Sequence, residues 1–330
     1  MNLRTDRRSF LVRALAAALG SALFPQSVRG QAWPSRPVHF IVGVPAGGLT
    51  DTYARAYGES VSQEIGQPVV VENRAGAGSI IACEAVARSP ADGYTFLFTI
   101  WAAIAQNQVL YSKLPYDPNK DFTFISSFDS GHLPLAVHKD VPAKDFPEFV
   151  EFARKNRVTL GTFSAGSYPH LVAAQMNKLY GTQVEAVHFR GEAPMWVELA
   201  AGRIHAAMGS QFGMLPHLQK GSVRPIAVNR TIRSPKLPGV ATFVEQGFRE
   251  PVFRIHSWIV LLGPAGLPRH IVERISKLVV AAADTPRLRE IHANLGVVEN
   301  ASTPEEFERR FRDEGPVWLS LVRELGVRFD

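Results

Sequence analysis

The chain has 330 residues, of which 46% are hydrophobic and 20% are charged. This composition is typical of a globular protein and excludes a disordered, collagen-like or coiled-coil chain, and the length predicts about two domains. The net charge of +6 at first suggests a nucleic-acid partner. Residues 1–32, however, hold five arginines against one aspartate, so most of that charge belongs to the N-terminus. We therefore expect no nucleic-acid partner.

Residues 1–32 have the pattern of an export signal peptide. A basic start is followed by an apolar stretch from Ala14, then by Pro25, and small residues end the segment at Ala32. A signal peptidase needs this order of basic, apolar and small residues. The run Arg7-Arg8-Ser9-Phe10-Leu11 resembles a twin-arginine motif, and an ordinary secretory signal or a mitochondrial presequence is the alternative. The apolar stretch is too short to span a bilayer.

Cysteine usage agrees with a free exported protein. Cys83 is the only cysteine, so no intramolecular disulfide can form, and no cysteine lies near the cleavage point to accept a lipid. We expect Cys83 to act as a small buried hydrophobic residue. The mature chain is therefore expected to be free and soluble. We also expect a monomer.

After residue 37, apolar runs rich in β-branched residues alternate with helical patterns. In chain order, strands are expected over 38–44, 69–71, 94–98, 133–137, 158–163, 184–189, 204–208, 223–228 and 255–262. Helices are expected over 53–65, 80–88, 146–155, 193–201 and 268–283, through Leu171 and Met176, and from a capping box at Thr303-Pro304-Glu305-Glu306. Gly315-Pro316 should break or kink the last helix.

This alternation predicts an α/β protein with βαβ units on mostly parallel sheets, because parallel strands need crossover connections. The helices after the last strand need a sheet to cover, and the first block has fewer long helices of its own. We therefore expect a discontinuous first domain, residues 33–129 plus 251–330. Residues 130–250 would be inserted as a second domain, and two connecting segments would form a hinge.

Two consecutive strand-to-helix turns rich in glycine are the main functional signal. The first contains Ala46, Gly47, Gly48, Thr50 and Asp51, and the second contains Ala75, Gly76, Ala77, Gly78 and Ser79. The first N–H groups of a helix are unpaired and carry partial positive charge, so a carboxylate or phosphate oxygen is a natural partner. Asp51 would repel an anion directly, but it could organise water or cap the helix. Tight turns without a ligand are the alternative.

A third turn, Ser164-Ala165-Gly166-Ser167, lies in the second block. Ligands of open α/β sheets bind outside the carboxyl ends of the strands, where all three turns should lie. We therefore expect the third turn to face the other two across a cleft between the domains.

Sequence motifs of enzymes and cofactor sites are weak or missing. The run from Gly76 to Ile81 begins like a dinucleotide fingerprint, but Ile81 stands where the third glycine is needed. The sequence contains no P-loop, no Gly-x-Ser-x-Gly and no His-Glu-x-x-His. His170, His188 and the other histidines are scattered along the chain. We expect no cofactor, no metal and no catalytic residue.

Ordered motifs over nearly the whole mature chain resemble the Bug-type receptors of tripartite tricarboxylate transporters. They are Trp33-Pro34-Ser35-Arg36-Pro37, Pro45 to Asp51, Gly66 to Gly78, Asp92-Gly93-Tyr94-Thr95, Leu114-Pro115-Tyr116-Asp117-Pro118, Lys120-Asp121-Phe122, Arg233-Ser234-Pro235 and Gly263 to Pro268. The resemblance implies the two-domain type II periplasmic-binding fold, in which two lobes close on a ligand. It also implies that the two glycine-rich turns grip a carboxylate, and that Ser164, Ser167 and His170 contribute from the other domain.

The family typically binds small organic acids, among them di- and tricarboxylates, acidic amino acids and aromatic acids, and its usual partner is a membrane transporter. This chain departs from the family pattern at three places. Ala75 and Ser79 replace proline and glycine in the second turn, Phe189-Arg190 replaces Tyr-Lys, and Ile204-His205 replaces Val-Asp. Arg190 could form a bidentate pair with a carboxylate, with a solvated arginine as the alternative.

Four aromatic residues near predicted strand ends could line a slot for the ligand, with core packing as the alternative: Phe163, Tyr168, Phe189 and Trp258. The sequence as a whole predicts a periplasmic receptor that captures a small organic carboxylate and delivers it to a transporter. An exported hydrolase or isomerase that acts on a small organic acid in the same cleft is the alternative. A sensory role, with the loaded receptor docked on a signalling partner, also stays open.

Overall fold

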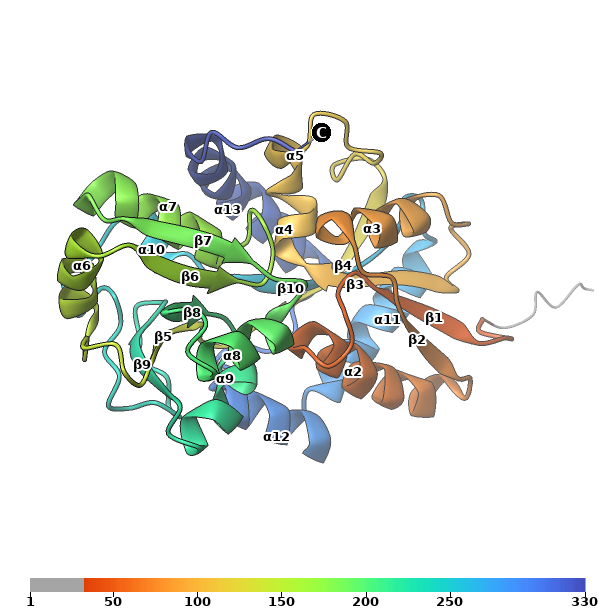
Figure 1. Cartoon of the computed structure of the whole chain (residues 1–330). Helices are drawn as coiled ribbons and strands as arrows, with labels where there is room; N and C mark the ends of the chain where they lie inside the picture. The colour runs from red at the N-terminus through yellow and green to blue at the C-terminus, as the bar shows by residue number, and fades with distance from the viewer. Residues whose placement is uncertain (1–32, 330) are drawn as a thin grey trace, which may run out of the picture. The chain divides into compact units, whose positions relative to one another are not determined.

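The computed structural model of the protein describes residues 33–329 (Figure 1). The chain divides at residues 35/36, and of the first part only residues 33–35 are described. The predicted signal peptide therefore lies outside the described residues. None of the described helices is both long enough and apolar enough to cross a membrane.

Within residues 33–329, ten strands build two five-stranded sheets. The first sheet has the order β2-β1-β3-β10-β4, with β1 Val38–Val42, β2 Val69–Asn73, β3 Thr95–Ile100, β4 Phe122–Asp129 and β10 Trp258–Pro264. The second has the order β7-β6-β8-β5-β9, with β5 Pro134–His138, β6 Val158–Thr162, β7 Val184–His188, β8 Ala206–Met208 and β9 Val223–Val228. We call each sheet with its covering helices lobe 1 and lobe 2, respectively.

Both sheets are mixed. In lobe 1, β1 runs parallel to β2 and β3, whereas β10 runs antiparallel to β3 and β4. In lobe 2, β6 runs parallel to β7 and β8, whereas β5 runs antiparallel to β8 and β9. The antiparallel strands β5 and β10 are those that follow each passage of the chain from one sheet to the other. The predicted α/β class is confirmed. The sheets are mixed and not mostly parallel as expected, because four of the eight described pairings, all made by β5 and β10, are antiparallel.

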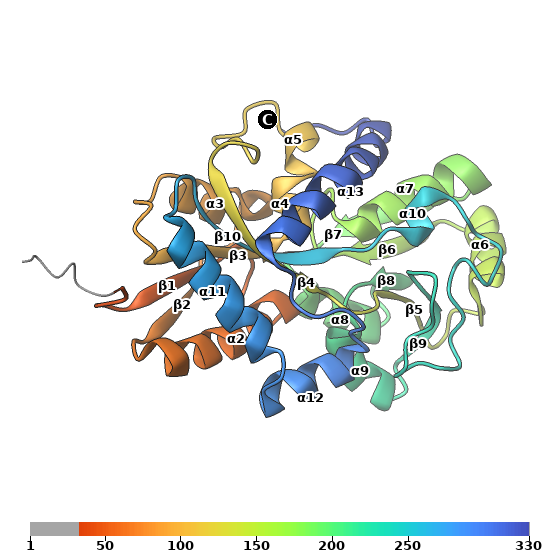
Figure 2. The ribbon, with the colours of Figure 1, turned by 180° about the vertical axis from the view of Figure 1, so that it is seen from behind.

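Helices cover the faces of both sheets. Lobe 1 has α2 Leu49–Ile65, α3 Ile80–Ala87, α4 Trp101–Ile104, α5 Asn107–Leu110, α11 Arg269–Ala282, α12 Pro286–Leu295 and α13 Pro304–Glu324, with a 3-10 turn, η1, at Ala77–Ser79. Lobe 2 has α6 Phe146–Lys155, α7 Tyr168–Tyr180, α8 Glu192–Ala200 and α9 Gln211–Gln219, and α10 Pro251–Arg254 lies on the returning segment. Because α11 and α13 both pack on β4, the prediction that the C-terminal helices cover the first sheet is confirmed (Figure 2). The predicted domain limits at 129/130 and 250/251 stay a prediction.

The ends of the long helices follow from local sequence. Thr303 accepts a hydrogen bond from the Glu306 amide while Glu306 accepts one from the Thr303 amide, so the predicted capping box is confirmed. Of the predicted break or kink at Gly315-Pro316, the break is wrong, because α13 continues through both residues. Phe307 before them and Trp318 after them are fully buried, and this packing holds the helix together across the missing N–H of the proline.

Candidate functional site

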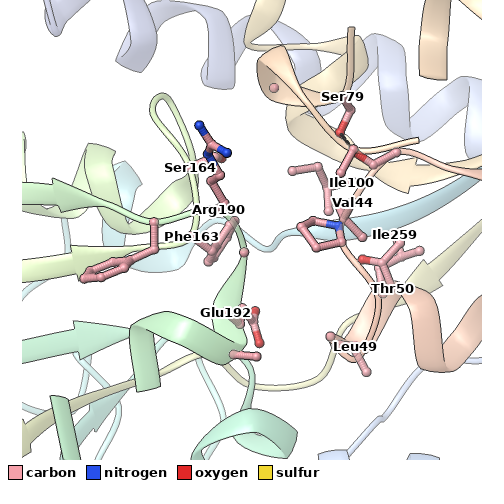
Figure 3. A pocket seen from close by; sticks show the side chains of 18 of the residues that line it. Val44, Leu49, Thr50, Ser79, Ile100, Phe163, Ser164, Arg190, Glu192 and Ile259 are labelled. Atoms are coloured by element: carbon pink, nitrogen blue, oxygen red, sulfur yellow. Dashed lines mark hydrogen bonds between the residues drawn. The ribbon is translucent and has the colours of Figure 1, made fainter. Parts of the chain in front are cut away.

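A cavity of about 650 Å³ lies between the two lobes. Its walls combine the two glycine-rich turns of lobe 1 with the turns after β6 and β7 of lobe 2 (Figure 3). The predicted residues that line it are Ala46, Gly48, Thr50, Ala75, Gly76, Ala77, Gly78, Ser79, Ser164 and Arg190. The three predicted turns therefore surround one space.

The first turn presents the N-terminus of α2 to this cavity. Gly48 is the N-cap residue, and a Cβ placed on it would meet no atom within 4 Å, so its backbone borders open space. The first hydrogen bond of the helix runs from the Thr52 amide to the Gly48 carbonyl. Among the described residues, the amides of Gly48, Leu49 and Thr50 have no acceptor, and they are available to an anion.

Asp51 fixes this turn instead of lining the cavity. Its carboxylate accepts hydrogen bonds from the Gly47 amide at 3.0 Å, from Asn73 Nδ2 at 2.9 Å and from Arg55 Nε at 3.1 Å. Burial raises the pKa of Asp51, but Arg55, Gly47 and Asn73 together hold it below its ordinary value. Asp51 therefore stays ionised, and its carboxylate is occupied by hydrogen bonds within lobe 1.

The second turn adopts an uncommon backbone conformation. Gly76, Ala77, Gly78 and Ser79 all have positive φ, with values of 45° for Ala77 and 73° for Ser79. Such values cost a residue with a side chain roughly 1–2 kcal/mol, and strain of this kind gathers at functional sites. Ser79 Oγ donates to the Gly43 carbonyl at 2.8 Å and Asn107 Nδ2 donates to the Gly78 carbonyl at 2.9 Å, so the turn is held from behind.

The backbone of this second turn also offers donors. Among the described residues, the amides of Gly76, Ala77 and Gly78 have no acceptor, while all three residues line the cavity. Together with the first turn, lobe 1 therefore supplies two groups of free backbone N–H groups facing one space.

The third turn is closed by its own hydrogen bonds. Ser167 Oγ donates to the Ser164 carbonyl at 2.6 Å, and the Gly166 amide donates to Nδ1 of His170 at 2.9 Å. A Cβ on Gly166 would overlap Leu110 of lobe 1, so the turn packs closely against the other lobe. Ser164 and Ala165 reach the cavity, whereas the rest of the turn lies behind them.

Five predicted site residues therefore do not line the cavity, because internal hydrogen bonds or packing engage them: Gly47, Asp51, Gly166, Ser167 and His170. His170 is also buried beside His188, with ring centroids 4.5 Å apart. Burial and the neighbouring His188 lower the pKa of His170 to about 4, so it is neutral at pH 7. No group of three or more potential metal ligands lies among the described residues.

Arg190 contributes a guanidinium group to the lining of the cavity. It is exposed, and among residues 33–329 it has no carboxylate partner and no hydrogen bond. Three of the four predicted aromatic residues, Phe163, Phe189 and Trp258, are among the residues that line the cavity. The Phe163 ring points away from lobe 1 (Figure 3), and the Trp258 side chain is buried. The fourth, Tyr168, is buried and donates its hydroxyl to the Val252 carbonyl at 2.7 Å, which is the core-packing alternative.

One charged group of the cavity was not among the predicted site residues. Glu192, the first residue of α8, lines the cavity, and both of its carboxylate oxygens accept hydrogen bonds from Ser210. In the sequence, Gly191-Glu192-Ala193-Pro194 has only the pattern of a helix start. Its partner Ser210 is the N-cap of another helix, α9, so no local signal could have revealed the site.

A family model described as "Tripartite tricarboxylate transporter family receptor" matches residues 53–327. The chain belongs to this family. The receptor is 28% identical to Protein BugT of Bordetella pertussis over 96% of this chain and 98% of BugT. The resemblance to Bug-type receptors is thereby confirmed.

Solved structures of similar proteins contain small acids. R. palustris Rpa4515 with adipate is 30% identical, with a TM-score of 0.83 over 90% of this receptor and 99% of that chain. MatC of Rhodopseudomonas palustris with bound malate is 27% identical, with a TM-score of 0.76 over 88% and 100%. The two-lobed periplasmic-binding fold expected for this receptor is confirmed by these neighbours.

Proposed function

We propose that this protein is a periplasmic solute-binding receptor. It holds a small organic carboxylate between its lobes and delivers it, as a monomer, to a tripartite tricarboxylate-type membrane transporter. The observation that carries this proposal is the set of unpaired donors around one cavity: free backbone amides of two turns from lobe 1 and the unpaired guanidinium of Arg190 from lobe 2. Unpaired donors that line a cavity can bind an acceptor from a ligand, and a carboxylate supplies up to four lone pairs.

The remaining walls suit a short carbon chain. Ile100 and Ile259 of lobe 1 and Phe189 of lobe 2 are among the residues that line the cavity. The volume of about 650 Å³ is ordinary for a small-molecule site. The relatives whose structures contain adipate and malate support a carboxylate with a short aliphatic chain as the ligand.

Lobe closure follows from the distribution of donors. Because lobe 1 and lobe 2 each supply part of the set, a ligand makes all its contacts only when both lobes surround it. The bound ligand therefore stabilises the closed arrangement, and a membrane transporter can distinguish loaded from empty receptor by that arrangement.

A thermal-shift screen of mono-, di-, tri- and aromatic carboxylates, followed by calorimetry, tests the proposal. A carboxylate at 100 times its Kd should stabilise the protein by about 2.7 kcal/mol and be recovered unchanged. Arg190→Gln should weaken binding about 10- to 100-fold, since a charge-assisted hydrogen bond contributes about 1.5–3 kcal/mol. Gly48→Pro should abolish binding, because it removes an amide donor of the first turn.

The control is Arg203→Gln, which removes an exposed arginine of lobe 2 that pairs with Glu198 away from the cavity. It should bind like the unmodified protein. The proposal fails if no carboxylate stabilises the protein, if Arg190→Gln and Gly48→Pro bind normally, or if the bound acid is consumed. Delivery is tested by uptake of the labelled acid into vesicles that contain the transporter, which should depend on added receptor.

A further inference from the structure

Arg190 and Glu192 place opposite charges in the cavity without pairing with each other. They are separated only by Gly191, whose φ of 99° turns the chain sharply. Figure 3 shows the two side chains pointing in different directions, with the Glu192 carboxyl on the lobe 2 wall, opposite Leu49 at the start of α2. The cavity therefore has a positive part and a separate negative part.

The Glu192 carboxylate is held firmly but is not neutralised. The Ser210 amide donates to Oε1 at 3.0 Å, and the Ser210 hydroxyl donates to Oε2. Ser210 is itself the N-cap of α9, where its Oγ accepts from the Gly213 amide, so the position of the carboxylate is fixed by a helix end. No lysine, arginine or histidine forms an ion pair with Glu192 among the described residues. Each oxygen keeps further acceptor capacity.

A purely negative ligand is poorly matched to this wall. Burial raises the pKa of Glu192, although the Ser210 hydrogen bonds lower it. A second carboxylate beside it would add repulsion. A cationic ligand group beside it would compensate the charge and use the remaining lone pairs.

We propose that the ligand carries an ammonium group as well as its carboxylate, and that Glu192 is the specificity-determining residue that receives it. This inference rests on the proposed function and narrows its substrate class to amino-substituted small carboxylic acids. The carboxylate meets the free amides and Arg190, while the ammonium meets Glu192 across the cavity.

Calorimetry with matched acids of equal chain length tests the inference in the unmodified protein. The pairs are succinate with aspartate, glutarate with glutamate, and adipate with 2-aminoadipate, and malate serves as the hydroxyl analogue of aspartate. For the chain length that fits, we expect the amino acid to bind at least about tenfold more tightly than the unsubstituted acid and the hydroxy acid. Equal or tighter binding of the unsubstituted or hydroxy acid would overturn the inference.

Glu192→Gln separates charge from shape, because glutamine keeps the length of the side chain and an oxygen acceptor for the Ser210 amide. It should reduce the affinity for the amino acid about 10- to 100-fold and leave the affinity for the unsubstituted acid unchanged or higher. Glu198→Gln is the matched control, since Glu198 lies on the same helix and pairs with Arg203 away from the cavity. It should change neither affinity.

A purely structural role of Glu192 would lower both affinities together in Glu192→Gln, and that result would overturn the inference. If the variant fails to fold by circular dichroism, the comparison of matched acids in the unmodified protein decides alone. Failure of the two proposals is distinguishable. Binding of unsubstituted acids in preference to amino acids contradicts only the role of Glu192, whereas absence of binding by every acid contradicts the proposed receptor function.

Discussion

Asp129 is predicted to be the residue on which the junction between the lobes depends most. It ends β4, just before the chain enters lobe 2, and its side chain is fully buried. Oδ2 accepts from Arg230 Nη1 at 3.0 Å and from the amide of Val298 at 3.1 Å. Oδ1 accepts from the Gly131 amide at 2.7 Å and lies 2.9 Å from Nε2 of His256. Both segments that pass between the sheets thus converge on one carboxylate.

The charge of Asp129 is strongly maintained. Burial raises its pKa, but the adjacent His256, Arg230 and the Val298 amide hold the pKa well below the ordinary range. Asp129→Asn keeps the shape, removes the charge, and turns an amide NH₂ toward groups that are themselves donors. Arg230, with 9% of its side chain exposed, then loses its closest anion. Removal of one partner from a buried ion pair costs about 3–5 kcal/mol.

Urea unfolding followed by circular dichroism measures this loss against the control Asp284→Asn. Asp284 pairs with Arg289 at 3.1 Å, but both side chains are more than two-thirds exposed, at 78% and 68%. Such exposed pairs contribute at most about 1 kcal/mol. If Asp129→Asn loses no more stability than Asp284→Asn, the Asp129 carboxylate does not hold the junction between the lobes.

Three further predictions concern buried groups. Burial lowers the pKa of both His170 and His256 to about 4, so below about pH 6.5 the unfolded chain binds a proton at each histidine that the folded chain does not bind. The free energy of unfolding should therefore fall between pH 6.5 and pH 4 by up to about 3 kcal/mol for each histidine. Equal urea midpoints at pH 7.5 and pH 4.5 would contradict this prediction. Gly131→Ala should destabilise the protein by about 1–3 kcal/mol in thermal unfolding, because the new Cβ would lie 2.5 Å from the Leu295 carbonyl oxygen. The control Gly181→Ala, at a similar φ but in open space, should lower the stability less. Equal losses of stability in the two variants would contradict this prediction. Burial raises the pKa of the Cys83 thiol to about 12, so iodoacetamide at pH 8 should label it only after unfolding, and fast labelling of the native protein would show an accessible thiolate.

The sequence was most informative where structure is locally encoded. The glycine-rich turns before α2 and α3 could be predicted because each follows a β-branched strand and precedes a helical pattern, and the structure brings both to one cavity. The capping box at Thr303 could be predicted because its residues are also neighbours in the sequence.

Long-range contacts explain what the sequence did not reveal. No strand was predicted at β4, because its buried Ser126 and Ser127 break the apolar pattern; both are satisfied by Ser302, which is far away in the chain. Glu192 could not be predicted as a site residue, because its partner Ser210 is the N-cap of another helix, α9. His170 was expected at the ligand, but its ring accepts the Gly166 amide and lies outside the cavity wall.

We propose that peptide N–H groups of two turns in lobe 1 capture a carboxylate together with Arg190 of lobe 2. A crystal structure of the protein with the tightest acid from the screen tests it most directly. We expect carboxylate oxygens about 3 Å from amides of the first turn (Gly48, Leu49, Thr50) or of the second (Gly76, Ala77, Gly78). We also expect the Arg190 guanidinium to be turned toward the ligand. An acid bound outside this cavity, or bound within it with its carboxylate away from both turns, would contradict the account.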